Sequence, residues 1–450
     1  MARLTGLALA SLLALSVSAA SWIAPGAVWY DTSGARIDAH GGMILKPGNV
    51  FYWVGQSWDS NTSPRIYSSE DLINWDNRGL ANSIEWLYRP KMFVSGGRYH
   101  IWGQVDRLTQ AMSSTDIAGG YSTYGSPMSI PPDSYTFSDC GVFADTDGND
   151  YWVTSADHNI VAINKINGHV NGGTDCSVGD RVAYLSLGAY EAPAMFKVGS
   201  VYFLIVSAKT GYRANPDKVF WATNLAGPWT GPSDIAPEST NTYNSQSTFV
   251  LTIAGSSQTT YMFMGDAWDS KGTSASNYMW LPVSASSSSH TVTLQDYAYW
   301  KVNPTTGVVT TSSTGKRYEA EDAAIAGRAA VTDCEHCITK RSVHQIDPSS
   351  NVTFTDVQGL GTGERQWMSL HYTVNNATGG DAFVHVNGEK FRVRDLNVRA
   401  GLHHTVPISV VLAKKNVVTF SVDSDDNMFE AHLDGIEVLD GTEDEIEVKL

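Results

Sequence analysis

Five polar side chains recur along this 450-residue chain at nearly even spacing, and their types suit acid–base or binding chemistry. They are His40, Arg89, Asp139, Glu191 and Gln246, with successive offsets of 49, 50, 52 and 55 residues. Each stands just ahead of a short apolar strand, which a turn and a second, aromatic strand follow. Two of the five are carboxylic acids, which can donate or accept a proton in catalysis.

The segments that carry these residues form a repeat, and the repeat predicts the fold. A period of this size built from short strands is typical of a β-propeller with four-stranded blades. The rhythm runs from about Trp22 to Val308 with almost no helical periodicity. We therefore expect an all-β chain whose residues 21–308 form a five-bladed propeller. Since the innermost strand of each blade faces the axis, the five side chains should converge on one funnel.

Glu191 is the strongest candidate for a general acid. A carboxyl group in a pocket rimmed by apolar strands loses hydration, which raises its pKa and keeps it protonated near neutral pH. A second carboxylate, Asp139, would raise that pKa further or orient the acid. Each residue also has an ordinary structural interpretation. Glu191 would be a buried acid with its hydrogen bonds satisfied, Asp139 would stabilise a turn, and Gln246 would be an unremarkable amide. Arg89 would be ion-paired, and His40 would be hydrogen-bonded. Their recurrence at one blade position favours a shared pocket.

Charge and the N-terminus narrow the possible function classes. Residues 1–20 have an Arg near the start, an apolar stretch and a small-residue end, which predicts a secretory signal peptide. No other segment reaches the length of a membrane span. The formal net charge of −16 argues against nucleic acid as a partner and against an acidic polysaccharide as the main ligand. We expect a secreted, extracellular protein without nucleic-acid or membrane partners.

A second domain is predicted after a short linker. Residues 309–316 are small and polar, as linkers often are. Residues 317–450 hold short alternating strands and no helical pattern, which predicts a β-sandwich of the jelly-roll type.

The four cysteines give one pairing and leave one open. Cys334 and Cys337 stand in the sequence CEHC, which in an exported chain favours a local disulfide over half a zinc site with His336. Cys140 and Cys176 either pair or remain as two buried thiols, and the sequence does not decide between these.

Several motifs resemble glycoside hydrolase family 43, and more narrowly its exo-β-1,3-galactanase branch. They are AHGGMIL, RPKMF, EAPAMFK, SQSTFVL and the block at 261–283, and the resemblance covers most of residues 22–305. It implies inverting hydrolysis of terminal β-1,3-linked galactose in arabinogalactan, a polysaccharide substrate. By the same resemblance, Glu191 is the general acid, Asp139 tunes and orients it, and Gln246 positions the attacking water. No catalytic cofactor is implied, and we expect a monomer.

The binding residues include departures from that branch. The wider family places an Asp base near the start of the first blade, where this chain has His40, and the galactanase branch also lacks this Asp. The branch commonly has Glu where this chain has Gln56 and Tyr88, and both positions are expected to bind galactose hydroxyls. His40 and Arg89 complete the predicted polar contacts, and Trp268, with Trp58 and Trp86, is an expected stacking wall. Two alternatives remain. An α-L-arabinofuranosidase or β-xylosidase is one, since the wider family includes both, although the missing Asp at His40 counts against it. An inactive carbohydrate-binding protein is the other, which the departures at Tyr88 and Gln56 keep open.

The C-terminal region resembles carbohydrate-binding module family 35. The residues that carry this are YEAEDA at 318–323, DAFVHVNGEKF and the closing LDGIEVL. The resemblance implies a structural calcium ion held by Glu319, Glu321 and Asp434, since carboxylate oxygens suit Ca²⁺. The alternative is a set of surface acids near the two ends of a sandwich.

Overall fold

The computed structural model describes residues 22–33, 35–132, 136–156, 159–168, 173, 175–269, 272–274, 276–311, 315–335, 337–363, 365–374, 382–393, 403–422 and 431–439. The expected signal peptide, His336 and part of the expected linker lie outside these ranges. The regular structure of the described chain is mostly β-strand, with short 3-10 turns and one α-helical turn, α1 (Asn241–Asn244), which confirms the all-β prediction. Within the described residues, none of the helices has the length and apolar character to cross a membrane.

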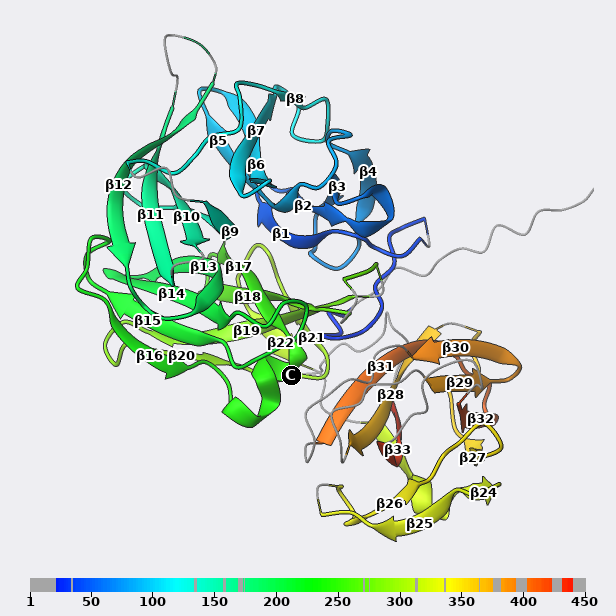
Figure 1. The fold of residues 1–450 in the computed structure, drawn as a ribbon. Coiled ribbons are helices and arrows are strands. Elements are labelled where there is room, and N and C mark those ends of the chain that lie inside the picture. Colours follow the sequence, from blue (N-terminus) through cyan, green and yellow to red (C-terminus); the bar gives the residue numbers. More distant parts are fainter. Residues whose placement is uncertain are drawn as a thin grey trace, which may run out of the picture.

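Residues 40–294 form five antiparallel sheets of four strands each, and the strands of every sheet lie in chain order (Figure 1). The first sheet contains β1 (His40–Leu45), β2 (Phe51–Ser57), β3 (Ser63–Ser69) and β4 (Asp76–Leu80). The second contains β5 (Tyr88–Ser95), β6 (Arg98–Val105), β7 (Leu108–Ser114) and β8 (Ser122–Thr123). The third contains β9 (Phe137–Ala144), β10 (Asp150–Ala156), β11 (Ile160–Asn167) and β12 (Ser177–Leu185).

The last two of these sheets follow the same order. The fourth contains β13 (Tyr190–Val198), β14 (Val201–Ala208), β15 (Lys218–Ala222) and β16 (Thr230–Asp234). The fifth contains β17 (Gln246–Ala254), β18 (Thr259–Ala267), β19 (Asn277–Ser286) and β20 (Thr291–Leu294). A two-stranded sheet of β21 (Trp300–Val302) and β22 (Val309–Thr311) comes next in the chain.

The five sheets close on themselves. Their first strands contact one another in the order β1, β5, β9, β13, β17 and back to β1, and we call this arrangement the ring. Apolar clusters fill the interfaces between neighbouring sheets. At the closing interface Trp53 of the first sheet packs against Trp280 of the fifth, with ring centroids 4.7 Å apart. The sheets therefore bury their faces against each other around a common axis.

β-bulges follow the recurring polar residue in four of the five first strands. The strand register shifts between His40 and Met43, Tyr88 and Lys91, Glu191 and Ala194, and Ser247 and Phe249. A bulge bends its strand and re-aims the neighbouring side chains. Four of the five recurring side chains contact one another directly: Arg89, Asp139, Glu191 and Gln246.

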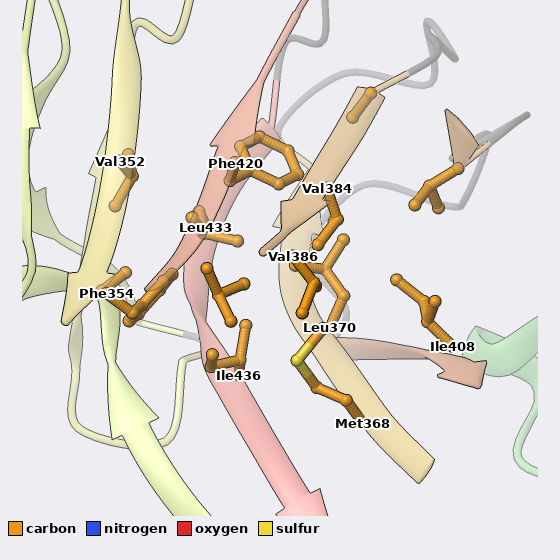
Figure 2. Close-up of a cluster of buried hydrophobic side chains, with 14 of the residues drawn as sticks. Val352, Phe354, Met368, Leu370, Val384, Val386, Ile408, Phe420, Leu433 and Ile436 are labelled. Carbon is orange, nitrogen blue, oxygen red and sulfur yellow. The ribbon is translucent and has the colours of Figure 1, made fainter. Parts of the chain in front are cut away.

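Residues 315–439 form two further sheets (Figure 1). One contains β25 (Ala330–Asp333), β26 (Arg341–His344), β33 (Ala431–Leu439), β28 (Arg365–Val374) and β31 (His403–Val411), with β23 (Gly315–Glu319) also paired to β33. The other contains β24 (Ala324–Ala326), β27 (Asn351–Val357), β32 (Asn416–Ser421), β29 (Ala382–Val386) and β30 (Glu389–Val393). Figure 2 shows the shared core, in which Leu370 and Ile436 of the first sheet belong to one apolar cluster with Phe354 and Val384 of the second.

An apolar cluster joins this C-terminal region to the ring. Its members come from the segment before β1, the segment before β21 and two C-terminal strands: Trp22, Ala24, Ala27, Tyr299, Trp367 and Leu439. The Tyr299 hydroxyl also lies 2.7 Å from the Ser369 hydroxyl, within hydrogen-bond distance. The two regions therefore meet through buried side chains. The described residues of the expected linker 309–316 are not irregular but belong to β22 and β23.

The structure shows which of the four cysteines are paired. Cys334 and Cys337 form a disulfide, which confirms that pairing and removes the half zinc site. Cys140 and Cys176 are not joined: Cys140 Sγ lies 3.4 Å from the Arg89 carbonyl oxygen, and Cys176 Sγ lies 3.6 Å from His100 Nε2.

The Ca²⁺ ion expected at Glu319, Glu321 and Asp434 stays a prediction, and Glu321 Oε2, which is buried without a hydrogen-bond partner among the described residues, would suit it. The Arg317 guanidinium donates from Nε to both oxygens of Glu319 at 2.8 and 2.9 Å, and from Nη2 to Asp434 Oδ2 at 2.6 Å. Glu321 Oε1 accepts from the Thr339 hydroxyl at 2.7 Å. Across the described residues, no group of three acidic, His or Cys side chains is placed to hold a metal ion.

We expect thermal unfolding of the C-terminal region to depend on Arg317. Asp434 is fully buried, so Arg317→Met would leave its charge uncompensated and destabilise the region by roughly 3 kcal/mol. Calorimetry of the full chain with and without EDTA is the measurement. Arg328→Met is the control, because Arg328 is 78% exposed in its pair with Asp347. A midpoint that falls on adding EDTA to the wild type would support the predicted Ca²⁺ ion, and an unchanged midpoint would count against it.

Candidate active site

Glu191 lies at the start of β13, partly exposed, where the recurring side chains meet. The Gln246 side-chain amide donates to Glu191 Oε1 at 3.2 Å. Burial, followed by repulsion from Asp139, raises the pKa of Glu191 to about 7, against the opposing effect of the Arg89 charge. A carboxyl group with this pKa keeps its proton close to neutral pH, which is the state that a general acid requires.

Asp139 is held as a salt-bridged carboxylate beside that acid. Arg89 Nε lies 3.1 Å from Asp139 Oδ1, and the backbone N–H of Ala192 donates to Asp139 Oδ2 at 3.0 Å. Ala192 has φ +55°, so the chain directly after Glu191 turns its N–H group toward Asp139. The two acids are thus neighbours in different environments, one salt-bridged and one not. Such differences allow two carboxyl groups to take different roles.

Gln246 is fixed by four neighbours. Its Oε1 accepts from Arg89 Nη2 at 2.6 Å and from Trp268 Nε1 at 2.9 Å. Its Nε2 donates to Glu191 Oε1 and, at 3.4 Å, to the Ser207 hydroxyl. The amide nitrogen therefore faces the candidate acid, and the amide oxygen faces the donors on the other side.

The Arg89 side chain is directed to protein groups of the site and not, as the sequence predicted, to a ligand. Besides Asp139 and Gln246, its guanidinium donates from Nη1 to the Ser247 carbonyl at 3.0 Å. The residue is only 5% exposed. Its donors are directed to protein acceptors, which matches the second role considered for it, that of an ion-pair partner.

The sequence predicted His40 as a ligand contact, but His40 is fully buried and presents no surface to a ligand. Its Nδ1 lies 3.0 Å from Asp266 Oδ1, and its ring stacks on Tyr278 with centroids 4.7 Å apart. Asp266 in turn accepts from the Gly41 N–H at 2.6 Å. His40 and Asp266 therefore form a support beneath the site.

The two departures from the family pattern lie in different surroundings. Gln56 is 2% exposed, and its Oε1 accepts from the Arg89 N–H at 2.9 Å, so it holds the backbone at Arg89. Tyr88 is partly exposed at the start of β5, and burial raises the pKa of its hydroxyl. Of the two, Tyr88 is the residue with surface left to meet a ligand.

Three aromatic rings stand beside Gln246 and form a cluster of edge-to-face pairs. Trp58 and Trp268 both pack against Tyr212, each with centroids 5.5 Å apart, and against each other at 6.4 Å. The sequence had named Trp58 and Trp268 but not Tyr212, which lies in the loop between β14 and β15 and is 37% exposed. Trp86, the other predicted wall, is 54% exposed before β5.

Sequence reasoning also missed buried charged groups below the surface of the site. Asp217 accepts from the Ser247 N–H at 2.9 Å, and burial raises its pKa to about 8. Lys91 is fully buried on β5. The repeat could not identify these two residues. Asp217 precedes an outer strand and not a first strand, and Lys91 lies inside the RPKMF motif without occupying the recurring position.

Comparison with solved structures finds the same architecture in carbohydrate-active enzymes. An exo-β-1,3-galactanase from Phanerochaete chrysosporium is 28% identical, with 93% of this chain and 100% of that chain covered and a TM-score of 0.79. Its structures hold galactose or, in variants with one glutamate replaced by Ala or Gln, β-1,3-galactotriose.

Two further structures share the fold at lower identity. An exo-β-1,3-galactanase from Clostridium thermocellum is 22% identical, with 93% of this chain and 100% of that chain covered and a TM-score of 0.59. A family 43 β-1,3-galactosidase with galactodeoxynojirimycin is 23% identical, with 62% and 100% covered and a TM-score of 0.55. No protein-family model and no curated protein sequence matches the chain. The chain is a glycoside hydrolase, and its structure groups it with the exo-β-1,3-galactanases of family 43.

Proposed function

We propose that this chain is a secreted, monomeric, exo-acting glycoside hydrolase that releases galactose, with inversion, from the β-1,3-galactan backbone of arabinogalactan. In this proposal the ring of five sheets is a five-bladed propeller that carries the reaction. The two C-terminal sheets are a carbohydrate-binding sandwich of the family 35 type.

One observation carries the proposal: a carboxyl group that is protonated near neutral pH stands beside a salt-bridged carboxylate. Glu191 can protonate the glycosidic oxygen as the bond breaks, because its pKa of about 7 leaves the proton available. Asp139 sustains that pKa by repulsion, while Arg89 and the Ala192 N–H keep the Asp139 carboxylate in place.

The attacking water is the remaining requirement. Inverting enzymes keep room for a water on the face of the sugar opposite the acid. We assign Gln246 to hold that water, since its amide is fixed beside Glu191 by Arg89 and Trp268. Retention would instead need a nucleophilic carboxylate next to Glu191, and Asp139 is the nearest candidate.

The sugar preference rests on the similar structures and on the aromatic cluster. The Phanerochaete enzyme, similar over its whole length, was crystallised with galactose and β-1,3-galactotriose. Trp58, Tyr212 and Trp268 offer aromatic surface beside the candidate acid. Tyr88, where the branch commonly has Glu, would change the hydroxyl contacts of the bound sugar, so the substrate must be measured directly.

The test is release of monosaccharide from purified β-1,3-galactan, arabinan and xylan, with the first-formed product followed by proton NMR. We expect galactose, from galactan only, as the α-anomer at early times. A β-anomer first product would refute inversion. Arabinose or xylose would indicate the neighbouring activities of the family. Binding to galactan without turnover on any of the three would indicate a carbohydrate-binding protein.

Activity should also depend on pH in a stated direction. Because the general acid must be protonated, kcat should be constant below the Glu191 pKa and fall as pH rises through about 7. The same raised pKa means that the folded state binds the Glu191 proton more tightly than the unfolded state. Glu191 therefore lowers stability progressively as pH rises from its unfolded value near 4.5 to about 7. Turnover that rises through pH 7 and stays high at pH 9 would exclude Glu191 as the acid.

A further inference from the structure

Lys91 is an unusual residue to find at the centre of this ring. It is fully buried on β5, two positions after Arg89, and is among the largest buried side chains of the described structure. Burying an ammonium group is costly unless hydrogen bonds or opposite charges compensate it. Its placement therefore calls for a function that an apolar side chain would not supply.

The amine is bonded to the backbone of another sheet. Lys91 Nζ donates to the Gly41 carbonyl at 2.5 Å and to the Gly42 carbonyl at 3.0 Å. These glycines form the bulge of β1, where the ladder with β2 skips from His40 to Met43. A side chain at Gly42 would meet the Val54 carbonyl oxygen at 1.8 Å, so the bulge has no room for one there.

Lys91 also lies between the candidate active site and an apolar cavity of the ring. The candidate acids stand at the starts of the first strands. The later residues of the same strands line an apolar cavity of about 460 Å³, with Met43, Met92 and Phe196 among the lining side chains. Along β5, Lys91 lies between Arg89 of the site and Met92 of the cavity. Its amine is thus a polar group between the candidate active site, at the starts of the first strands, and the apolar cavity.

The charges around the amine are those of the site itself. Arg89 on the same strand opposes its positive charge, while Asp139 on β9 and Asp266 on β18 favour it. Burial is the largest effect and lowers the Lys91 pKa to about 7. A neutral amine has two N–H donors, matching the two glycine carbonyls, whereas the ammonium form has three.

We propose that Lys91 is a positioning residue of the active site: its amine holds the β1 bulge by two backbone carbonyls and sets the charge beneath Asp139 and Arg89. The inference rests on the proposed hydrolase function for its kinetic readout. When Lys91 is protonated, its charge stabilises the ionised acids above it; when it is neutral, that stabilisation is lost. The pH response of the site is then a property of Lys91 together with Glu191.

Lys91→Met, which keeps the length of the side chain and removes the amine, is the test. We expect kcat/KM to fall roughly 10- to 100-fold, because a displaced bulge shifts the groups built on it. We also expect the pH profile to shift, because Lys91 carries its charge near Asp139, whose own charge raises the pKa of Glu191. Val250→Ala, in the cavity on β17, is the matched control: it loosens the core and should leave the pH profile in place.

A Lys91→Met profile that superimposes on the wild type, at equal kcat/KM, would overturn the proposal. If wild type hydrolyses a sugar other than galactan, the proposed substrate fails and the same comparison is made on that sugar. If the variant does not fold, NMR of the wild type labelled at lysine Cε gives a readout independent of activity. We expect one lysine signal that titrates near pH 7 and persists in Lys209→Arg. A spectrum with no lysine titrating below about pH 9 would contradict the proposal.

Discussion

Glu191→Gln should lower kcat on unactivated β-1,3-galactan by about 10² to 10⁴-fold, the range that general acid catalysis typically contributes. The substitution keeps the shape of the side chain and the hydrogen bond with Gln246, but a carboxamide has no carboxylic proton to give to the leaving oxygen. It also removes the group whose pKa lies near 7. Steady-state kinetics across pH 5 to 9 is the measurement, and the alkaline limb should disappear with the activity.

The leaving group separates proton donation from other causes of inactivity. A nitrophenyl galactoside, if the site accepts it, needs little protonation, so Glu191→Gln should lose less on it than on galactan. Gln246→Ala is the matched comparison: misplacing the water does not depend on the leaving group, so both substrates should suffer equally. Undiminished turnover of galactan by Glu191→Gln would remove this residue from the chemistry.

Arg89→Met should cost both stability and activity. The Arg89 side chain bonds Asp139, Gln246 and the Ser247 carbonyl, and removing one partner of a buried ion pair typically costs roughly 3 to 5 kcal/mol. Both the acid pair and the water-holding amide would lose their orientation, so kcat should fall at least 100-fold, an order of magnitude known for misplaced catalytic groups. Urea unfolding and kinetics on the same preparation measure the two effects.

An exposed arginine provides the control for charge removal alone. Arg78 pairs with Asp76 at 3.6 Å, with 44% and 56% of the side chains exposed, and such pairs contribute below about 1 kcal/mol. Arg78→Met should therefore be close to wild type in both measurements. Wild-type kcat in Arg89→Met, with stability lowered, would show that Arg89 supports the fold and not the site.

The local pattern of the sequence was enough to find where the site lies. A recurring strand, turn and aromatic strand predicted the positions of Asp139, Glu191 and Gln246, and the structure brings these into contact through Arg89. This part could be predicted because the signal is periodic and each unit is short. The all-β character follows from the same alternation.

The roles of individual side chains could not be predicted in the same way. His40 and Arg89 read as ligand contacts, but their partners lie 226 and 157 residues away in the chain, at Asp266 and Gln246. The bulges that re-aim these side chains leave no mark on the repeat. Lys91, Asp217 and Tyr212 take their functions from such distant neighbours, so only the folded chain reveals them.

The closure of the ring has a consequence for how the chain reaches its native state. Trp53 and the rest of the first sheet are covered by Trp280 and Trp300 of the last segments, and Ile23 pairs by backbone hydrogen bonds with Trp300. During synthesis, roughly 200 residues must follow before these partners exist, which takes about 10 to 40 s. Through that interval the first sheet presents unburied aromatic surface. Nascent chains shorter than about 300 residues should therefore depend on chaperones. This dependence should end when the fifth sheet and Trp300 cover the first sheet.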